Sequence, residues 1–349
     1  MTYKFHSNCL LFSMVLIFLQ FFQPSLSKAQ FAEVDALLEQ RKSLYGGNIV
    51  VLAWRADSIF YKKEIGELTI NSQEPIAAAS TWFTAALVMN FVDQGKISLD
   101  DPVSKYLPIF RQYAKGYLTI RHCLEHTTGL EVEKGGIQKF FQKTRFASLE
   151  EEVNAFASKR EIVNNPGEEF YYSNIGINIV GRVLEIVGKK NFDRLMTEKI
   201  FRPLGMKKSS FSTEYAVNPY SGARSSAADY VKFMAMILNK GTLNGKKVLS
   251  EESVAELTSL QNKDIKMGFV PKAAEGYSYA LGSWIQETNS KGEPAVLSSP
   301  GLFGSWAYID KCRNYSCIVL VKNQSKEDKN DLYIEVKEEI DKQVRSSCN

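Results

Sequence analysis

The sequence predicts an α+β fold in which strands from both ends of the chain form one antiparallel sheet. Two early segments, 48–54 and 58–61, and four late segments, 277–286, 295–298, 303–310 and 315–321, have strand-like patterns of apolar residues. Between them, apolar residues recur mainly with helical spacing. We therefore expect a sheet part at about 29–75 and 260–349, flanked by helices, and an inserted, mainly helical part at about 76–259.

The first 28 residues are typical of a signal peptide. Lys4 precedes an apolar run at 9–22 that is short for a bilayer span, and small residues follow at Ser25, Ser27 and Ala29. The alternative is an uncleaved membrane anchor. We expect an exported chain, periplasmic or secreted, whose contact with the membrane is limited to this segment.

Nine helices are expected from the apolar patterns. They are predicted at 31–43, 75–95, 118–126, 149–158, 175–187, 192–201, 225–238, 250–257 and 331–344. The helix at 75–95 is apolar on nearly every face, which predicts burial. Pro75 suits its entry and Gly95 its end. Its crowded small residues near the N-terminus are suited to a hydrolase nucleophile, because free N–H groups there stabilise negative charge.

Charge and cysteine content limit the possible classes of protein. The 349 residues include 43 Lys and Arg against 39 Asp and Glu, and the interspersed charges do not suggest nucleic-acid binding. Export permits disulfides among Cys123, Cys312, Cys317 and Cys348. Cys312 and Cys317 flank a predicted hairpin turn and can pair across it. The sequence does not choose among the three connectivities that four cysteines allow.

Several segments together carry a family resemblance. They are FTAALVMNFVDQGKISLDDPVSKYLP at 83–108, LTIRHCLEHTTGL at 118–130, PGEEFYYSNIGINIVGRVLE at 166–185, FRPLGM at 201–206 and ARSSAADYVKFMAMIL at 223–238. In these segments the chain resembles the serine β-lactamase-like and penicillin-binding-protein-like hydrolases, in the branch of class C β-lactamases, D-alanyl peptidases and esterases. The resemblance implies a β-lactamase/transpeptidase-like fold, a single serine-hydrolase-like domain at 29–349, and no cofactor.

The first motif of that family is Ser-x-x-Lys, which supplies the acylated nucleophile and a base. Matching Phe83 and the two residues after it to the family's usual flank puts the nucleophile position at Ala78 and the base position at Thr81. No lysine lies between Lys63 and Lys96. The resemblance therefore implies that both reactive groups are replaced. Ser80 is an alternative nucleophile, but it lies about 200° around the helix from position 78.

The second and third motifs are present in whole or in part. Tyr172 and Asn174 match Tyr-x-Asn, whose tyrosine shuttles a proton and whose asparagine holds a substrate amide in the family. The competing interpretation is a turn beside a helix. Ser299, Gly301 and Leu302 follow the third motif, with serine where relatives carry Lys or His. Gly301 permits close backbone approach, and the Leu302 N–H is a candidate oxyanion donor.

The predicted site thus has Tyr172 and Asn174 as its catalytic-type residues, with Ala78 and Thr81 at the altered positions. The expected ligand-binding residues are Ser80, Trp82, Ser299, Gly301, Leu302 and Trp306. Trp82 also fits a core position.

A further pattern, H-x-x-E-H, places His122 and His126 four residues apart, as in inverted zinc proteases. The family resemblance already accounts for both histidines as structural residues, so no metal is predicted. A zinc hydrolase using both histidines stays the remote alternative.

The favoured hypothesis is an exported, catalytically impaired monomer that binds a cell-wall peptide, a β-lactam-like molecule or an ester. The first alternative is an active esterase, D-alanyl peptidase or β-lactamase with an unconventional nucleophile such as Ser80.

Overall fold

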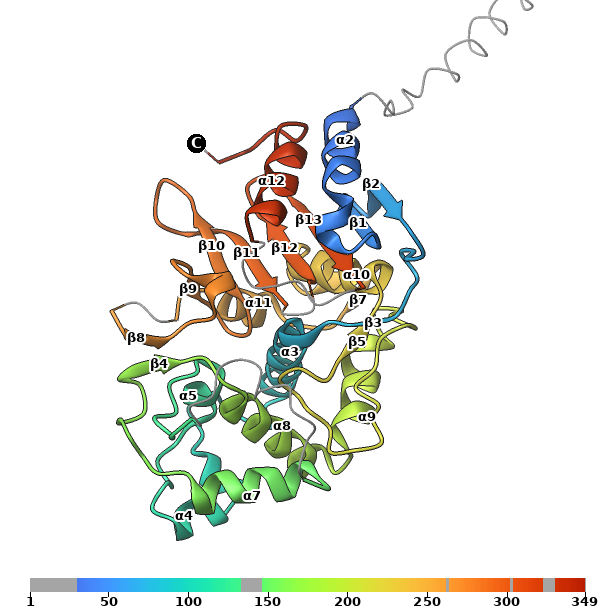
Figure 1. The fold of residues 1–349 in the computed structure, drawn as a ribbon. Coiled ribbons are helices and arrows are strands. Elements are labelled where there is room, and N and C mark those ends of the chain that lie inside the picture. Colours follow the sequence, from blue (N-terminus) through green and yellow to red (C-terminus); the bar gives the residue numbers. More distant parts are fainter. Residues whose placement is uncertain (1–29, 133–145, 262–263, 302–303, 323–329, 349) are drawn as a thin grey trace, which may run out of the picture.

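The computed structural model describes residues 30–132, 146–261, 264–301, 304–322 and 330–348. Its main feature is a seven-stranded antiparallel sheet in the order β2-β1-β13-β12-β11-β10-β9 (Figure 1). The strands are β1 (Ile49–Arg55), β2 (Ser58–Ile65), β9 (Ser278–Tyr279), β10 (Trp284–Thr288), β11 (Pro294–Pro300), β12 (Trp306–Asp310) and β13 (Tyr315–Val321). The predicted union of both chain ends in one sheet is confirmed, because β1 pairs with β13 from Ile49↔Val321 to Trp54↔Ser316.

Helices cover both faces of the sheet, which explains the apolar content of β1. Ile49 and Val51 join a core with α2 (Ala32–Arg41) and α12 (Asn330–Asp341). Val50 and Leu52 point to the opposite face, where they join the larger core that includes α10 (Ala227–Leu238). Successive side chains of a strand alternate between faces, so a strand covered on both sides is apolar throughout.

The remaining helices and short strands build the middle of the chain and its connections. The helices are η1 (Lys42–Tyr45), η2 (Ala77–Ala79), α3 (Ser80–Asp93), η3 (Val103–Lys105), α4 (Ile109–Gln112), α5 (Ile120–Leu124), α7 (Leu149–Lys159), α8 (Asn174–Gly188), α9 (Phe192–Met196), η4 (Thr197–Phe201), α11 (Glu251–Leu257) and η5 (Lys272–Ala274). The short strands are β3 (Glu74–Pro75), β4 (Glu169–Tyr171), β5 (Arg224–Ser225), β6 (Thr242–Leu243), β7 (Lys246–Lys247) and β8 (Lys266–Phe269).

The α3 helix lies between the sheet and the helical part (Figure 1). Every residue from Ser80 to Met89 is buried, which confirms the burial predicted for this segment. The ring of Phe83 packs against Phe201, Tyr230 and Phe233 at centroid distances of 4.7–5.2 Å. The helix begins later than predicted, because Pro75 belongs to β3 and Ala77–Ala79 form a 3₁₀ turn.

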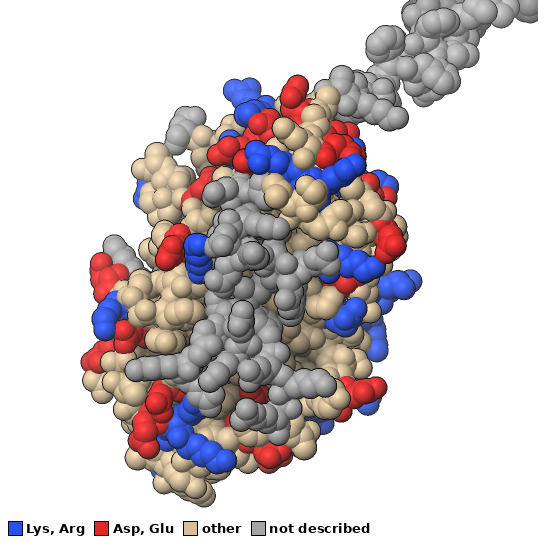
Figure 2. Space-filling model, viewed as in Figure 1, with Lys and Arg blue, Asp and Glu red and all other residues tan. Residues whose placement is uncertain are grey.

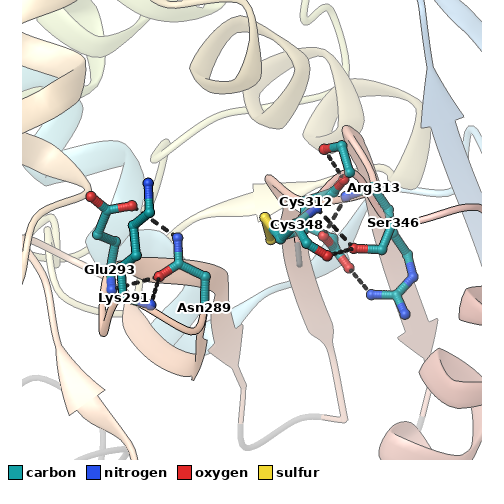
Figure 3. Close-up of a disulfide and its surroundings, with 9 residues drawn as sticks. Asn289, Lys291, Glu293, Cys312, Arg313, Ser346 and Cys348 are labelled. Atoms are coloured by element: carbon teal, nitrogen blue, oxygen red, sulfur yellow. Dashed lines mark hydrogen bonds and ion pairs between the residues drawn. A yellow bond between two sulfur atoms is a disulfide. The ribbon is translucent and has the colours of Figure 1, made fainter.

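One disulfide joins Cys312, after β12, to Cys348 near the C-terminus (Figure 3). The Ser347 N–H also donates to the Cys312 carbonyl oxygen at 2.8 Å. The Cys312–Cys317 pairing considered from the sequence does not form, since Cys317 lies inside β13 opposite Tyr308. Cys317 and Cys123 are buried free thiols.

On the face shown in Figure 2, basic and acidic side chains are interspersed, as the sequence indicated. Within the described ranges, no helix is both long and apolar enough to span a membrane.

Candidate functional site

The site is organised around the 3₁₀ turn that leads into α3. Ala77 has a φ of 46°, a backbone conformation that costs a non-glycine residue free energy. Hydrogen bonds on both sides hold the residue before it: the Ile76 N–H donates to the Ala223 carbonyl at 3.1 Å, and the Ser305 hydroxyl donates to the Ile76 carbonyl at 3.2 Å. Ala78 follows, with 6% of its surface exposed.

Thr81 lies beside Tyr172. The Thr81 hydroxyl donates to the Tyr220 carbonyl at 3.0 Å. The side chains of Thr81, Tyr220 and Trp284 lie around the Tyr172 phenol, where their polar groups act to lower its pKa. Burial nevertheless raises the pKa of Tyr172 to about 12. Position 81 therefore brings a neutral hydroxyl to the phenol and supplies no positive charge that would favour a phenolate.

Aromatic rings fix the orientation of Tyr172. Its ring lies 4.5 Å from His126, 5.1 Å from Trp284 and 5.6 Å from Tyr220, measured between centroids. His126 Nε2 is 3.0 Å from the Tyr279 hydroxyl, and its Nδ1 accepts from the Ser173 N–H at 3.4 Å. Burial lowers the pKa of His126 to about 3, so the ring is neutral and supports the turn that carries Tyr172.

Asn174 is the first residue of α8, and its side chain is hydrogen-bonded to the buried carboxylate of Glu152. Its Nδ2 donates to Glu152 Oε1 at 3.2 Å, and Asn178 Nδ2 donates to Glu152 Oε2 at 3.0 Å. Sequence reasoning missed Glu152. A signal was present, because Glu152 shares the inward face of α7 with Leu149, Val153 and Phe156. Nothing local in the sequence indicated that Tyr220 and Trp284 reach Tyr172.

The end of β11 packs against the start of α3. The Ser299 side chain lies beside the hydroxyl of Tyr230, which donates to the Ala79 carbonyl at 3.0 Å. A methyl group at Gly301 would collide with Ser305 Oγ and lie 2.9 Å from the Ile76 carbonyl oxygen, so glycine is required here. Leu302, the candidate oxyanion donor, lies outside the described residues.

The two tryptophans that were predicted to bind a ligand, Trp82 and Trp306, do not line the site around Tyr172, so that prediction is wrong. Trp82 is fully buried and packs edge-on against Phe233 at 5.8 Å. Trp306 stacks on Tyr333 of α12 at 5.2 Å, on the face of the sheet opposite α3. Strand alternation explains the second error, because Ala307 and Ile309 are the β12 residues that face the α3 side.

Ser80 is also fully buried. Its hydroxyl donates to the Ala77 carbonyl at 2.5 Å and accepts from the Ala223 N–H at 3.0 Å. Ser80 therefore ties the helix start to the segment before β5.

The two histidines do not share a helical face, contrary to the zinc alternative. The α5 helix ends at Leu124, and His126 has a φ of 57°. His122 instead forms a capping box with Thr119 at the start of α5. Among the described residues, no group of three or more His, Cys, Asp or Glu side chains is arranged to hold a metal ion.

Comparisons with known proteins agree with this architecture. The family model described as Beta-lactamase matches residues 44–339. The uncharacterized protein MT1414 of Mycobacterium tuberculosis is 23% identical, with 78% of this chain and 85% of that protein covered.

Two solved structures extend the match in three dimensions. A putative beta-lactamase from Bacteroides dorei has a TM-score of 0.79 at 27% identity, over 89% of this chain and 98% of that one. An octameric penicillin-binding protein homologue from Pyrococcus abyssi has a TM-score of 0.73 at 21% identity, over 88% of this chain and 76% of that one. Because the family model covers most of the chain, this protein belongs to the Beta-lactamase family.

Proposed function

We propose that this protein is a non-hydrolysing member of its family that binds a ligand at the Tyr172 site. The observation that carries the proposal is the pairing of Tyr172 with Thr81 rather than with a lysine. Acylation by the family route needs a nucleophile and a base that takes its proton. Ala78 offers a methyl group at the first position, and Thr81 offers a neutral hydroxyl at the second.

The state of Tyr172 supports the same proposal. With a pKa of about 12, its phenol is neutral near pH 7 and suits hydrogen bonding to a ligand better than proton abstraction. Removing a nucleophile in other serine hydrolases leaves only the residual catalysis due to binding and the oxyanion hole, which is orders of magnitude below that of the intact enzyme.

The alternative of an active hydrolase using Ser80 has little geometric support. A nucleophilic serine needs an accessible oxygen and a nearby base. The Ser80 hydroxyl is fully buried, and both of its hydrogen bonds join it to the backbone.

The proposed ligand class follows from the groups that are left. Asn174 is half-buried, and among the described residues its oxygen accepts no hydrogen bond. A carboxamide beside a neutral phenol suits an amide-bearing molecule, so we propose a peptidoglycan-type peptide or a β-lactam-like molecule, with an ester as the weaker candidate.

We further propose that the chain is exported and acts as a monomer. The Cys312–Cys348 disulfide suits an oxidising compartment.

The deciding experiment combines intact mass spectrometry with a binding assay. We expect no covalent adduct after incubation with a fluorescent penicillin or an activated fluorophosphonate, together with reversible polarisation changes for the penicillin. A mapped adduct on any serine would contradict the non-hydrolysing assignment. Export is tested separately by N-terminal sequencing of the protein recovered from cell fractions.

A further inference from the structure

A buried carboxylate lies directly behind the asparagine of the proposed site. Glu152 is 6% exposed, and its two oxygens accept from Asn174 and Asn178 at 3.2 and 3.0 Å. Among the described residues, no basic side chain forms an ion pair with it. Two cations on the packed elements have other partners: Arg182 of α8 pairs with Glu150 and Glu185, and Lys115 after α4 donates to the Ala157 carbonyl.

Asn178 cannot turn its carboxamide over. Its side chain is fully buried, its Nδ2 donates to Glu152, and its Oδ1 accepts from the Tyr220 N–H at 3.1 Å. A rotation by 180° would place an amide N–H against the Tyr220 N–H and an oxygen against the carboxylate. Asn178 therefore requires an acceptor at the Oε2 position of residue 152 in every state of the site.

Asn174 has no such second restraint among the described residues. Its orientation depends on what Glu152 presents at Oε1. An ionised carboxylate only accepts hydrogen bonds, so Asn174 must turn its Nδ2 toward Glu152. The carboxamide oxygen of Asn174 is then directed away from Glu152.

We propose that Glu152 is a positioning residue that fixes the Asn174 carboxamide with its oxygen available to a ligand, so that the site favours ligands carrying an amide N–H. This inference rests on the proposed ligand-binding function and adds the polarity of the group that Asn174 recognises. Glu152 itself is buried behind α8 and acts only through Asn174.

Protonation of Glu152 would reverse this polarity. Burial raises the pKa of Glu152 to about 7, while the two amide hydrogen bonds oppose that shift. A protonated Glu152 keeps its carbonyl oxygen for Asn178 and turns its O–H toward Asn174, which then rotates to accept it. The preference for an amide N–H should therefore weaken as the pH falls below about 7.

The substitution Glu152→Gln tests the proposal because glutamine has one acceptor and one donor. The fixed Asn178 takes the glutamine oxygen, so the glutamine NH₂ faces Asn174 and turns it over at every pH. Glu150→Gln is the matched control, because it makes the same change on the same helix at a side chain that is 58% exposed.

The binding probes are fluorescein-labelled acetyl-D-alanyl-D-alanine and its ester analogue, in which an oxygen replaces the terminal amide N–H. In polarisation assays at pH 8, we expect the wild type to bind the amide about 10-fold more tightly than the ester, for one hydrogen bond to a fixed acceptor. The ratio should fall to about one in Glu152→Gln and stay at the wild-type value in Glu150→Gln. An unchanged ratio in Glu152→Gln would overturn the proposal.

A second measurement does not depend on binding. In ¹⁵N-asparagine-labelled protein, the side-chain amide signals of Asn174 should shift with a midpoint near pH 7 in the wild type and stay constant in Glu152→Gln. The signals are assigned by their loss in Asn174→Asp. Absence of this titration in the wild type contradicts the positioning role. Failure of the wild type to bind either probe contradicts the proposed peptide ligand and the N–H preference, whatever the titration shows.

Discussion

The start of α3 and the turn before α8 meet at Thr81 and Tyr172, and they differ in the chemistry that they carry. The start of α3 has a strained backbone at Ala77 and a dense set of backbone contacts, but only methyl and hydroxyl side chains. The entry into α8 carries the Tyr172 phenol and the Asn174 carboxamide; His126 accepts from the Ser173 N–H between them, and Glu152 accepts from Asn174. The first segment therefore offers backbone and small side chains, and the second offers the polar groups on which the proposed ligand binding rests.

This difference shows that the scaffold does not depend on the reactive side chains. The α3 start is held by the Ile76–Ala223 and Tyr230–Ala79 hydrogen bonds and by packing of Phe83. None of these contacts involves the side chain at position 78 or 81. Alanine at position 78 and threonine at position 81 are thus compatible with the family fold, because these contacts come from the backbone and from neighbouring side chains.

The largest expected effect comes from restoring the missing groups. In Ala78→Ser with Thr81→Lys, we expect fluorophosphonate labelling and ester hydrolysis to rise at least about 100-fold above the wild type, because a nucleophile and its base act together beside Tyr172. Each single substitution is the control and should give little gain, since such residues act as a unit. No gain in the folded double variant would show that the second and third motifs no longer support the chemistry.

The next largest effect is a pH dependence of stability that comes from Glu152, the carboxylate that contacts Asn174, and that the start of α3, with its uncharged side chains, does not contribute. Glu152 has a folded pKa of about 7 against 4.5 for the ordinary side chain, so the folded state binds the proton more tightly. The stability due to this group is complete below about pH 4.5 and is lost as the pH rises through 7. The loss is about 3 kcal/mol, at about 1.36 kcal/mol per pH unit.

Chemical unfolding at pH 4.5, 6 and 8 measures this loss. In Glu152→Gln the fall in unfolding free energy over this range should be smaller by that amount. Glu125, whose pKa burial also raises to about 7, is present in both proteins and cancels in the difference. Equal pH dependence in the two proteins would show that Glu152 ionises with its ordinary pKa.

The smallest effect tests whether Ser80 is structural. Ser80→Ala removes an acceptor from the buried Ala223 N–H, which should lower the unfolding free energy by about 1–3 kcal/mol. Ser158→Ala is the control, because Ser158 is exposed and bonds only to the Asn154 carbonyl of its own helix; its effect should stay within about 0.5 kcal/mol. If Ser80→Ala leaves the free energy of unfolding unchanged but abolishes covalent labelling, Ser80 would instead be identified as a nucleophile.

Local patterns in the sequence sufficed for most of the secondary structure. Strand β13 falls at the predicted 315–321, and α8 and α10 fall within two residues of their predicted bounds. The predicted strand at 277–286 is instead divided, because Gly282 has a φ of 81° and packs on the backbone of Thr81. A close approach between segments that are distant in sequence leaves no periodic signal.

The sequence by itself determined which chemical groups stand at positions 78, 81, 172 and 174, because the motif flanks set their registers. Only the tertiary structure decided which of the other candidate site residues lie close to these four positions. It placed Trp306 on the far face of the sheet, paired Cys312 with Cys348, and put Glu152 behind Asn174. Each of these results depends on strand pairing and helix packing between distant segments, and burial among such segments is also what raises the pKa of Glu152.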